Sequence, residues 1–312
     1  MATPTGVPSA AGEAILDWYG LVGRSLPFRA TTDPYAILVS EAMAQQTQAA
    51  RAGEAWARFM HTFPTVDALA TATTADVLRA WRGLGYNRRA VNLQRAAAWI
   101  VERHGGRVPS EVAALEALPG VGPYTARAVA AIAFGEPVGA VDTNVRRVLG
   151  RLVVGADEAV PPSTVQSIAD ASVPLGRSAA WTHALMDLGA TVCRPRRPAC
   201  HACPAAPWCR TASTGSAGGA RTIPVGRGQS RGNANGSFPA TSRWLRGQIV
   251  DRLRSAPDGA WVAIEAPIGE HDRAAVDRAL ESLARDGVVQ IRAQAADRAM
   301  AADGTRMARL PI

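Results

Sequence analysis

The chain has 312 residues, 47% of them hydrophobic, which is enough for two domains and at least one sizeable core. No apolar run approaches the roughly 18 residues that cross a bilayer, and residues 1–15 lack the basic and apolar regions of a secretory signal, so we expect a cytoplasmic protein without membrane contact. The net charge of +8 suits a polyanionic partner, and all 34 basic residues are arginine, so no side-chain amine is present to form a Schiff base.

Helical spacing of apolar residues dominates the first two thirds of the chain, and no long β-branched alternating run interrupts it. Short Gly- and Pro-containing turns separate the helical segments. The sequence therefore predicts a mostly α-helical domain over residues 11–210. Its expected helices cover residues 14–21, 35–50, 54–60, 77–81, 91–101, 112–118, 125–134 and 144–152.

The composition changes after residue 210. Residues 211–242 are rich in Gly, Ser, Thr, Asn and Arg, which predicts a flexible linker. Beyond it, the pattern predicts helices over 243–254 and 272–286 and short strands over 261–265 and 288–291. Helix, strand, helix and hairpin tip is the order of a winged-helix-like module, which we expect over residues 243–312.

A glycine-containing turn over residues 118–122 (LPGVG) opens the expected helix 124–134. At Gly120 and Gly122, backbone N–H groups can approach an anion closely, and a helix N-terminus favours negative charge. A helix-hairpin-helix turn binds a DNA phosphate in this way without recognising sequence, although such a turn can also be an ordinary connection. About twenty residues later, Asp142 stands next to a helix start, a position that also suits a helix cap.

All four cysteines of the chain lie in one run, CRPRRPACHACPAAPWC, with the spacing C-x6-C-x2-C-x5-C. Four prolines bend this run, so the four thiolates can converge on one point. A four-cysteine zinc site usually has two close pairs of cysteines, and only one such pair is present here. The spacing favours an iron–sulfur cluster and leaves zinc as the alternative. The expected ligands are Cys193, Cys200, Cys203 and Cys209.

Several motifs, in this order and spacing, resemble the helix-hairpin-helix/Gly-Pro-Asp superfamily of DNA glycosylases, and within it the adenine DNA glycosylases of the MutY type. The resemblance covers about residues 15–210. It implies a helix-hairpin-helix glycosylase fold with a [4Fe–4S] cluster loop, and base excision repair of mismatched double-stranded DNA. The motifs are LPFR (26–29), DPY (33–35), SEAMAQQTQ (40–48), GLGY (83–86), LPGVGPYTA (118–126), VDTNVRRVL (141–149), MDLGA (186–190) and the cysteine run.

Two positions select the branch of the superfamily. Endonuclease III relatives carry a catalytic lysine at the place of Tyr124 and lack the glutamate found at Glu41. Because the chain has no lysine, we expect a monofunctional glycosylase without a lyase step. The adenine members have Gln-Gln-Thr after the glutamate, as at 45–47 here. A thymine or other mismatch glycosylase is the alternative within the superfamily, and a non-catalytic iron–sulfur DNA-binding regulator is the alternative from another class.

Breaking an N-glycosidic bond requires a proton on the leaving base and stabilisation of an oxocarbenium-like sugar, and two carboxylates in different environments can divide this work. Glu41 stands in an apolar helical stretch that would raise its pKa, so we expect it to protonate adenine. Asp142, next to a helix N-terminus, is expected to stay ionised, and by resemblance it stabilises the sugar cation. Tyr124 and Asn144 would complete the polar shell of these catalytic residues.

The resemblance also implies the residues that extrude the base from the stack. Gln46 and Tyr86 would insert into the duplex, Arg29 would contact the extruded adenine, and Thr47 and Leu84 would lie near the opposing base.

Three positions depart from the family pattern and put the fine shape of the pocket in question. His183, at a substrate-contacting position, stands where relatives tend to have Gln or Glu. Asn87 replaces a second aromatic residue, and Phe28 replaces a usual Trp. Arginines 146, 147, 194, 196 and 197 are expected to contact phosphates, with affinity that falls as salt rises.

The family's adenine members typically carry a C-terminal Nudix-like domain that recognises 8-oxoguanine opposite the adenine. Only about 70 residues remain here for the C-terminal module, and their pattern differs. We expect removal of adenine mispaired with guanine or 8-oxoguanine, by a monomer whose C-terminal module offers a surface for a repair partner.

Overall fold

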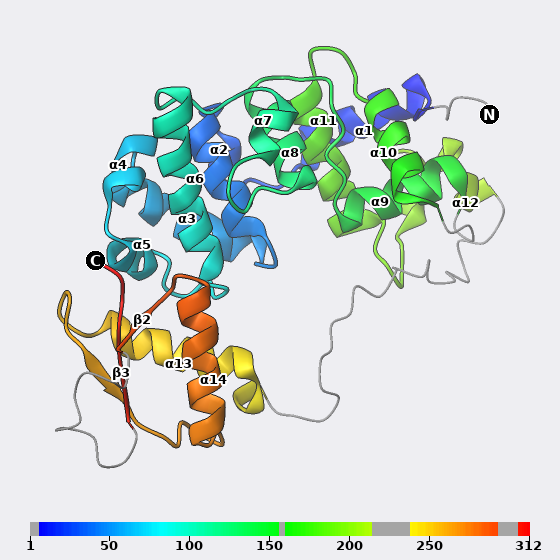
Figure 1. Cartoon of the computed structure of the whole chain (residues 1–312). Coiled ribbons are helices and arrows are strands. Elements are labelled where there is room, and N and C mark those ends of the chain that lie inside the picture. Colours follow the sequence, from blue (N-terminus) through cyan, green and yellow to red (C-terminus); the bar gives the residue numbers. More distant parts are fainter. Residues whose placement is uncertain (1–5, 156–159, 214–237, 293–304) are drawn as a thin grey trace. The chain divides into compact units, whose positions relative to one another are not determined.

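Helices dominate the part of the chain that the computed structural model describes, which is residues 6–155, 160–213, 238–292 and 305–312 (Figure 1). The prediction of a mostly α-helical fold is therefore confirmed. The helices are α1 (Ser9–Val22), α2 (Pro34–Ala44), α3 (Ala49–Thr62), α4 (Val66–Thr71), α5 (Thr74–Ala80), α6 (Arg88–His104), α7 (Val112–Glu116), α8 (Pro123–Ala133), α9 (Thr143–Leu149), α10 (Pro162–Ala171), α11 (Ser178–Asp187), α12 (Arg210–Ser213), α13 (Ser242–Arg254) and α14 (Arg273–Arg285).

Short turns of other helical types accompany them. Two π-helical turns, Gly150–Val154 and Leu188–Val192, continue α9 and α11. Turns of 3-10 helix cover Pro27–Arg29, Cys200–Ala202, Ala206–Trp208 and Phe238–Ala240. Among the described residues, no helix is long and apolar enough to cross a membrane.

The chain divides into two compact units. Unit 1 consists of Met1–Glu41 and Val108–Ser230, and unit 2 consists of Ala42–Arg107 and Arg231–Ile312. Unit 2 therefore combines an early part of the chain with its C-terminal part. Most of the expected linker, residues 214–237, lies outside the described residues, and the boundaries 11–210, 211–242 and 243–312 stay a prediction.

The core of unit 1 forms where α1, α9, α10 and α11 bury their apolar faces. Ile15 of α1, Leu149 of α9 and Trp181 of α11 are almost completely buried in one cluster. Each large apolar side chain that is fully buried contributes about 1.5–3 kcal/mol. α8 belongs to the same unit and is rich in buried alanines, which let its backbone approach its neighbours closely.

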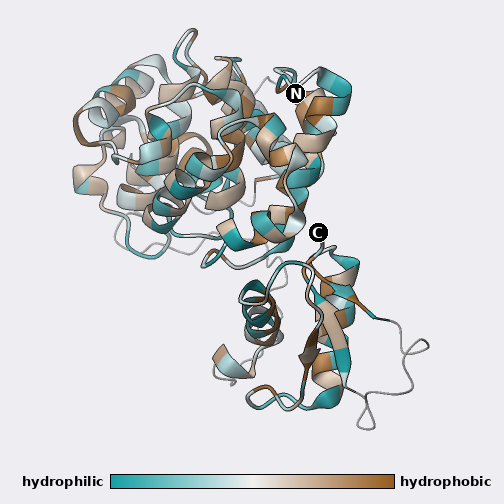
Figure 2. Ribbon diagram, turned by 90° about the vertical axis from the view of Figure 1, so that its left-hand side faces the viewer, coloured by the Kyte–Doolittle hydropathy of each residue, from teal (hydrophilic) through white to brown (hydrophobic). Residues whose placement is uncertain are grey.

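Unit 2 has a core of its own. Phe59 of α3, Ile100 of α6 and Trp81, which follows α5, are buried, and the Phe59 and Trp81 rings meet edge to face with centroids 5.9 Å apart. Aromatic pairs prefer this geometry because the positive ring edge faces the negative ring face. In Figure 2, hydrophobic (brown) and hydrophilic (teal) segments alternate along the helices, as they do in amphipathic helices that cover a core.

The C-terminal part of unit 2 contains α13, α14 and a small antiparallel sheet. The strands are β1 (Val262–Ile264), β2 (Gln290–Ile291) and β3 (Arg306–Arg309), in the order β1-β3-β2. The first four of these five elements were predicted within two residues at each end. The central strand β3 was not predicted, because the stretch RMAR carries no alternating β-branched pattern. The assignment to a winged-helix-like module stays a prediction.

One predicted helix is wrong. The helix expected over 35–50 is two helices, because α2 ends at Ala44 and α3 begins at Ala49. Between them, Gln46 has a φ of 53°, in the left-handed region that an α-helix cannot contain. Apolar spacing does not register a single residue of this kind.

Candidate active site

Glu41 lies on α2 in unit 1 and is buried, with 8% of its surface exposed. Burial raises its pKa from 4.5 to about 7. A hydrogen bond with the Tyr124 hydroxyl and the charge of Arg29 work against this rise, and the negative charge of Asp142 adds to it. Glu41 therefore exchanges its proton near neutral pH, as a general acid needs.

Tyr124 lies in the first turn of α8, directly after the hairpin turn. Its hydroxyl interacts with Glu41 and also donates toward Met186 Sδ at 3.8 Å. Burial and the two neighbouring carboxylates raise the pKa of Tyr124 well above its ordinary value, so the phenol stays a donor. The structure thus brings Glu41, Tyr124 and Asp142 into one interacting group.

Asp142 is the N-cap of α9. Its Oδ1 accepts the backbone N–H of Val145 at 2.7 Å, and its Oδ2 accepts Asn144 Nδ2 at 2.9 Å. These two donors hold both oxygens of the carboxylate at the start of the helix. The helix-cap interpretation and the expected catalytic role are compatible, since the cap fixes the orientation of the carboxylate.

Arg147 connects Asn144 to the cysteine run. Its Nη2 donates to Asn144 Oδ1 (2.8 Å) and to the carbonyl oxygen of Gly189 (2.7 Å), and its Nε donates to the carbonyl oxygen of Cys193 (2.7 Å). A Cβ at position 189 would lie 2.6 Å from Asn144 Cβ, so only glycine fits there. These internal acceptors hold the guanidinium of Arg147 in place, and its expected phosphate contact stays a prediction.

Asp187 holds the arginine that was expected at the extruded adenine. Arg29 Nη1 and Nη2 each donate to one Asp187 oxygen at 2.8 Å, and Asp187 is 1% exposed. Burial alone would raise the pKa of Asp187, but hydrogen bonds from Arg29 and Arg24 hold it down to about 2. The fork-to-fork pair fixes the guanidinium plane, while Arg29 Nε is buried without a hydrogen-bond partner among the described residues.

His183 on α11 lies beside the same arginine. Burial lowers its pKa from 6.5 to about 4, and the positive charge of Arg29 acts in the same direction. The Tyr19 ring lies 6.3 Å away, centroid to centroid. At neutral pH the imidazole is uncharged, so it can donate one hydrogen bond and accept another.

The hairpin turn has the geometry that an anion requires. Gly120 has a φ of 79°, which favours glycine, and Gly122 is the N-cap of α8. Both glycines are exposed, and a Cβ on Gly122 would meet no atom within 4 Å. The start of α8 at Gly122 is therefore open to an approaching group.

Four expected DNA-contacting residues lie on two loops of unit 2. Gln46 and Thr47 lie on the loop after α2, and Leu84 and Tyr86 lie on the loop before α6. Gln46 and Tyr86 are exposed, and they are the non-glycine residues of the described chain with a positive φ, 53° and 46°. Such strained backbone persists only where the surroundings hold it. Leu84 is buried.

Arg89 ties these two loops together. Its Nη1 donates to the carbonyl oxygens of Ala42 (2.9 Å), Met43 (3.0 Å) and Gln45 (2.5 Å). Its Nη2 donates to Thr47 Oγ1 (3.2 Å) and to the carbonyl oxygens of Leu84 and Gly85. Burial lowers the pKa of Arg89 to about 10, which still leaves it charged.

The four cysteines line one small pocket in unit 1, together with Arg151. Arg151 is buried, its Nη1 lies 3.5 Å from Cys193 Sγ, and it also donates to the carbonyl oxygens of Arg194 and Pro195 at 2.8 Å. Cys209 Sγ and Thr211 Oγ1 donate to the Arg151 carbonyl oxygen. Within the described residues, no three His, Cys, Asp or Glu side chains lie close enough together to hold a single metal ion.

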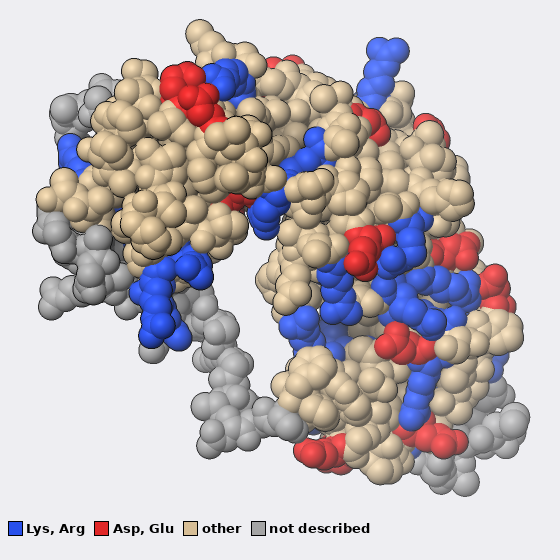
Figure 3. Space-filling view, turned by 180° about the vertical axis from the view of Figure 1, so that it is seen from behind, with Lys and Arg blue, Asp and Glu red and all other residues tan. Residues whose placement is uncertain are grey.

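Charged side chains are mixed rather than segregated. Figure 3 shows one face on which arginines (blue) gather with acidic residues (red) among them. Arg194, Arg196 and Arg197 on the cysteine run are exposed, as phosphate contacts require, whereas Arg146 donates to the carbonyl oxygen of Val160.

Residues 39–171 match the family of HhH-GPD superfamily base excision DNA repair proteins. An adenine DNA glycosylase of Mycobacterium tuberculosis is 43% identical over 298 residues, which are 91% of this chain and 92% of that protein. The chain belongs to the adenine DNA glycosylase family. The human adenine DNA glycosylase is 42% identical over 202 residues, 60% of this chain and 36% of that protein. A thermostable thymine-DNA glycosylase structure matches with a TM-score of 0.62 and 30% identity, over 65% of this chain and 95% of that one.

Sequence reasoning missed the residues that hold the loops of the candidate site in place. Arg89, Arg151 and Asp187 received no role, although the motif MDLGA that contains Asp187 contributed to the resemblance. The partners of these residues lie far along the chain or are backbone carbonyls, which no motif reveals.

We predict a stability difference between the wild type and Glu41→Gln that depends on pH. Between pH 4.5 and 7 the unfolded chain loses the Glu41 proton while the folded chain keeps it, so Glu41 lowers the free energy of unfolding as pH rises. His183, whose pKa is depressed, acts in the opposite direction over pH 4 to 6.5. The variant lacks only the first effect, so it should gain about 3 kcal/mol relative to the wild type across this range.

Urea unfolding of both proteins at several pH values measures this difference. Glu13→Gln, at an exposed position of α1, is the control and should show no such change. A Glu41→Gln difference that is constant with pH would contradict the raised pKa.

Proposed function

We propose that this adenine DNA glycosylase of base excision repair removes adenine mispaired with guanine or 8-oxoguanine, by hydrolysis and without a lyase step. The proposal rests on Glu41, a buried carboxyl group that interacts with Tyr124 and Asp142. Burial raises the pKa of this group to about 7. Two carboxylates in such different environments can serve as proton donor and as charge stabiliser.

In the proposed reaction, protonated Glu41 donates its proton to a ring nitrogen of the extruded adenine. The electron pair of the N-glycosidic bond leaves with the base, and positive charge develops on the sugar. Asp142, oriented by Val145 N–H and Asn144, stabilises that charge. Glu41, now ionised and hydrogen-bonded by Tyr124, accepts a proton from the attacking water, which leaves an abasic sugar.

The absence of lysine supports the monofunctional assignment. Strand cleavage through a lysine Schiff base is not available to a chain without lysine, and by resemblance Tyr124 stands where that lysine would be. The product would therefore be an intact strand with an abasic site.

The contacts with the adenine, a phosphate and the duplex are assigned to residues of each unit. Arg29 and His183 would bind the adenine, since Arg29 Nε is unsatisfied and His183 is neutral. Gly120 and Gly122 would bind a phosphate, and the exposed Gln46 and Tyr86 would enter the duplex near Thr47 and Leu84. We infer a monomer that acts on nucleoid DNA in the cytoplasm.

The four cysteines fit a [4Fe–4S] cluster. Sulfurs that line one small pocket around a buried arginine suit a bulky anionic group, because the guanidinium can donate to cysteine sulfur. Cys193, Cys200, Cys203 and Cys209 would hold the cluster, which would supply a rigid cross-link for residues 193–209 rather than chemistry at the base.

The similarity to a thymine-DNA glycosylase structure makes thymine the second candidate substrate. Release of thymine rather than adenine from mismatched duplexes would favour that candidate. Binding without any base release would instead favour a non-catalytic regulator.

Glu41→Gln should reduce adenine excision by about 100-fold or more, since the amide cannot donate the proton that the leaving base needs. Affinity for the mismatched duplex should stay within about threefold of the wild type. Single-turnover excision and gel-shift titration measure the two quantities, with Glu13→Gln as the control. Full excision by Glu41→Gln would overturn the proposed role.

Adenine release should be at least about tenfold faster opposite 8-oxoguanine or guanine than opposite cytosine. Single-turnover rates on three duplexes that differ only in the opposing base test this selectivity. Equal rates would contradict the proposed mismatch specificity while leaving adenine excision intact.

Purified protein should contain about four iron atoms and absorb visible light, because a [4Fe–4S] cluster has that composition. The chain has no other cysteines, so metal analysis reports on this site alone. Cys203→Ser should lose both iron and absorbance. One bound zinc and no iron would identify the alternative site.

A further inference from the structure

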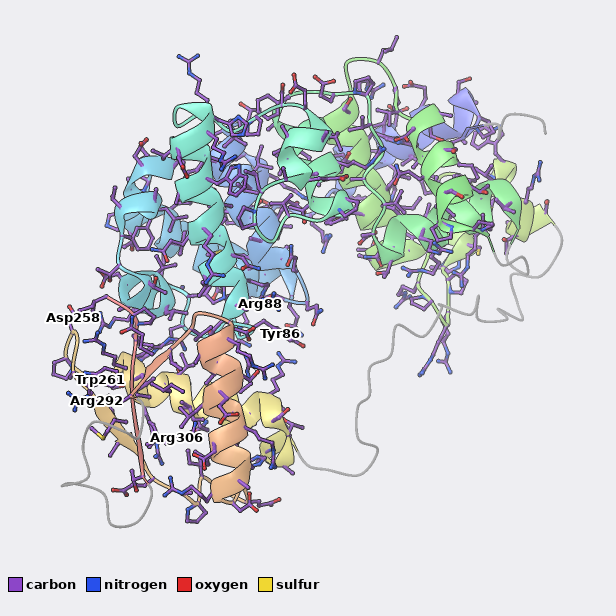
Figure 4. The ribbon with its side chains drawn as sticks, in the orientation of Figure 1. Tyr86, Arg88, Asp258, Trp261, Arg292 and Arg306 are labelled. Atoms are coloured by element: carbon purple, nitrogen blue, oxygen red, sulfur yellow. The ribbon has the colours of Figure 1, made fainter. Side chains whose placement is uncertain are left out.

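The Tyr86 ring lies between two arginines of unit 2. Arg243, in the first turn of α13, has its guanidinium carbon 4.2 Å from the ring centroid, and Arg89 of α6 lies 5.6 Å from it. Figure 4 labels Tyr86 and Arg88 at the end of α6 that faces the C-terminal helices. A cation over an aromatic face attracts the ring, so Arg243 of α13 contributes to holding Tyr86.

The other end of α13 is anchored to the same loop. Arg254 is buried, its Nε donates to the carbonyl oxygen of Leu78 (2.8 Å), and its Nη2 donates to Asn87 Oδ1 (2.9 Å). Asp251 Oδ1 accepts from Arg254 Nη1 at 2.7 Å. Asn87 is the N-cap of α6 but forms no side-chain cap hydrogen bond, because its oxygen faces Arg254 instead.

Further polar contacts fasten the C-terminal elements to residues 75–88. Arg79 forms an ion pair with Asp258 (2.5 Å), and Arg88 forms one with Asp286 (3.7 Å). The backbone N–H of Ala75 donates to the carbonyl oxygen of Pro311 at 2.8 Å. On the sheet of the module, Arg292 and Arg309 lie over the Trp261 ring.

The exposed side of Tyr86 opens onto a groove. This cavity has a volume of about 720 Å³ and is lined by Gln46, Arg51, Tyr86, Arg243 and Gln248, among others. The ring therefore has two arginines beside it but remains 40% exposed, as an inserting side chain must be.

We propose that α13 positions the wedge loop, defined as residues 83–87, with Arg254 anchoring Asn87 and Arg243 holding the Tyr86 ring ready to enter DNA. The proposal rests on the proposed function, in which Tyr86 inserts into the duplex. Tyr86 has a left-handed φ of 46°, which a tyrosine keeps only when its surroundings hold it. An ordered loop loses less conformational freedom on binding, so the holding contacts favour the mismatch complex. Arg254 and Arg243 are positioning residues, since they act through the loop.

Arg254→Met tests the anchor in the full-length protein. It leaves the Leu78 carbonyl and the Asn87 amide without their donor, so amide hydrogen exchange over residues 82–88 should become about tenfold faster. The preference for mismatched over matched duplex should fall about tenfold as well, because only the mismatch complex uses the inserted ring. Arg252→Met, at an exposed arginine of the same helix, should change neither quantity.

A merely structural role would lower the affinity for both duplexes in proportion and would spread the faster exchange over unit 2. Either result, or unchanged exchange over residues 82–88, would overturn the proposal. The exchange measurement needs no catalysis. Failure of the proposed function would be seen as excision that survives Glu41→Gln, so it can be distinguished from failure of the positioning role.

Arg243→Met keeps the test open if Arg254→Met does not fold, since Arg243 is exposed. It should lower the mismatch preference about threefold with Tyr86 present and have no effect on the preference in a Tyr86→Leu background. An equal loss of affinity in both backgrounds would mean that Arg243 contacts phosphate directly, and would overturn its positioning role.

Discussion

Burial of one carboxyl group, Glu41, is the constraint on which the proposed chemistry depends. A charged carboxylate without water is destabilised, so the group keeps its proton to about pH 7. The surroundings temper this effect, because Tyr124 donates a hydrogen bond and Arg29 supplies positive charge. The α8 hairpin that carries Tyr124 and the α9 cap that carries Asp142 both serve to place polar groups around this buried acid.

In unit 1 and in unit 2, arginine side chains connect separate segments of the chain by hydrogen bonds. Arg147 and Arg89 each donate to backbone carbonyl oxygens of different segments, and Arg151 donates to those of Arg194 and Pro195. A planar guanidinium with donors on its edges can bridge such acceptors, whereas a lysine ammonium is a compact point charge. In unit 1 these bridges run from the cysteine run through Arg147 and Asn144 to Asp142. The positive charge of the chain is therefore partly structural, which net charge alone cannot distinguish from DNA binding.

Two arginines at opposite ends of α13 attach the C-terminal module to the rest of unit 2. Arg254 and Arg243 meet the loop that carries Tyr86 and Asn87. Asn87 accepts a hydrogen bond from Arg254, which an aromatic side chain at this position could not do.

The sequence by itself determined the mostly helical fold, the family and the absence of lysine chemistry, because these follow from local periodicity, ordered motifs and composition. It also singled out Glu41, Tyr124 and Asp142, which the tertiary structure brings into one interacting group. Only that structure decided the break at Gln46, the strand β3 and the bridging roles of Arg89, Arg147 and Arg254. Those features depend on burial and on hydrogen-bond acceptors that are distant in sequence or belong to the backbone. The spacing of side chains along the chain reveals neither the acceptors nor the burial.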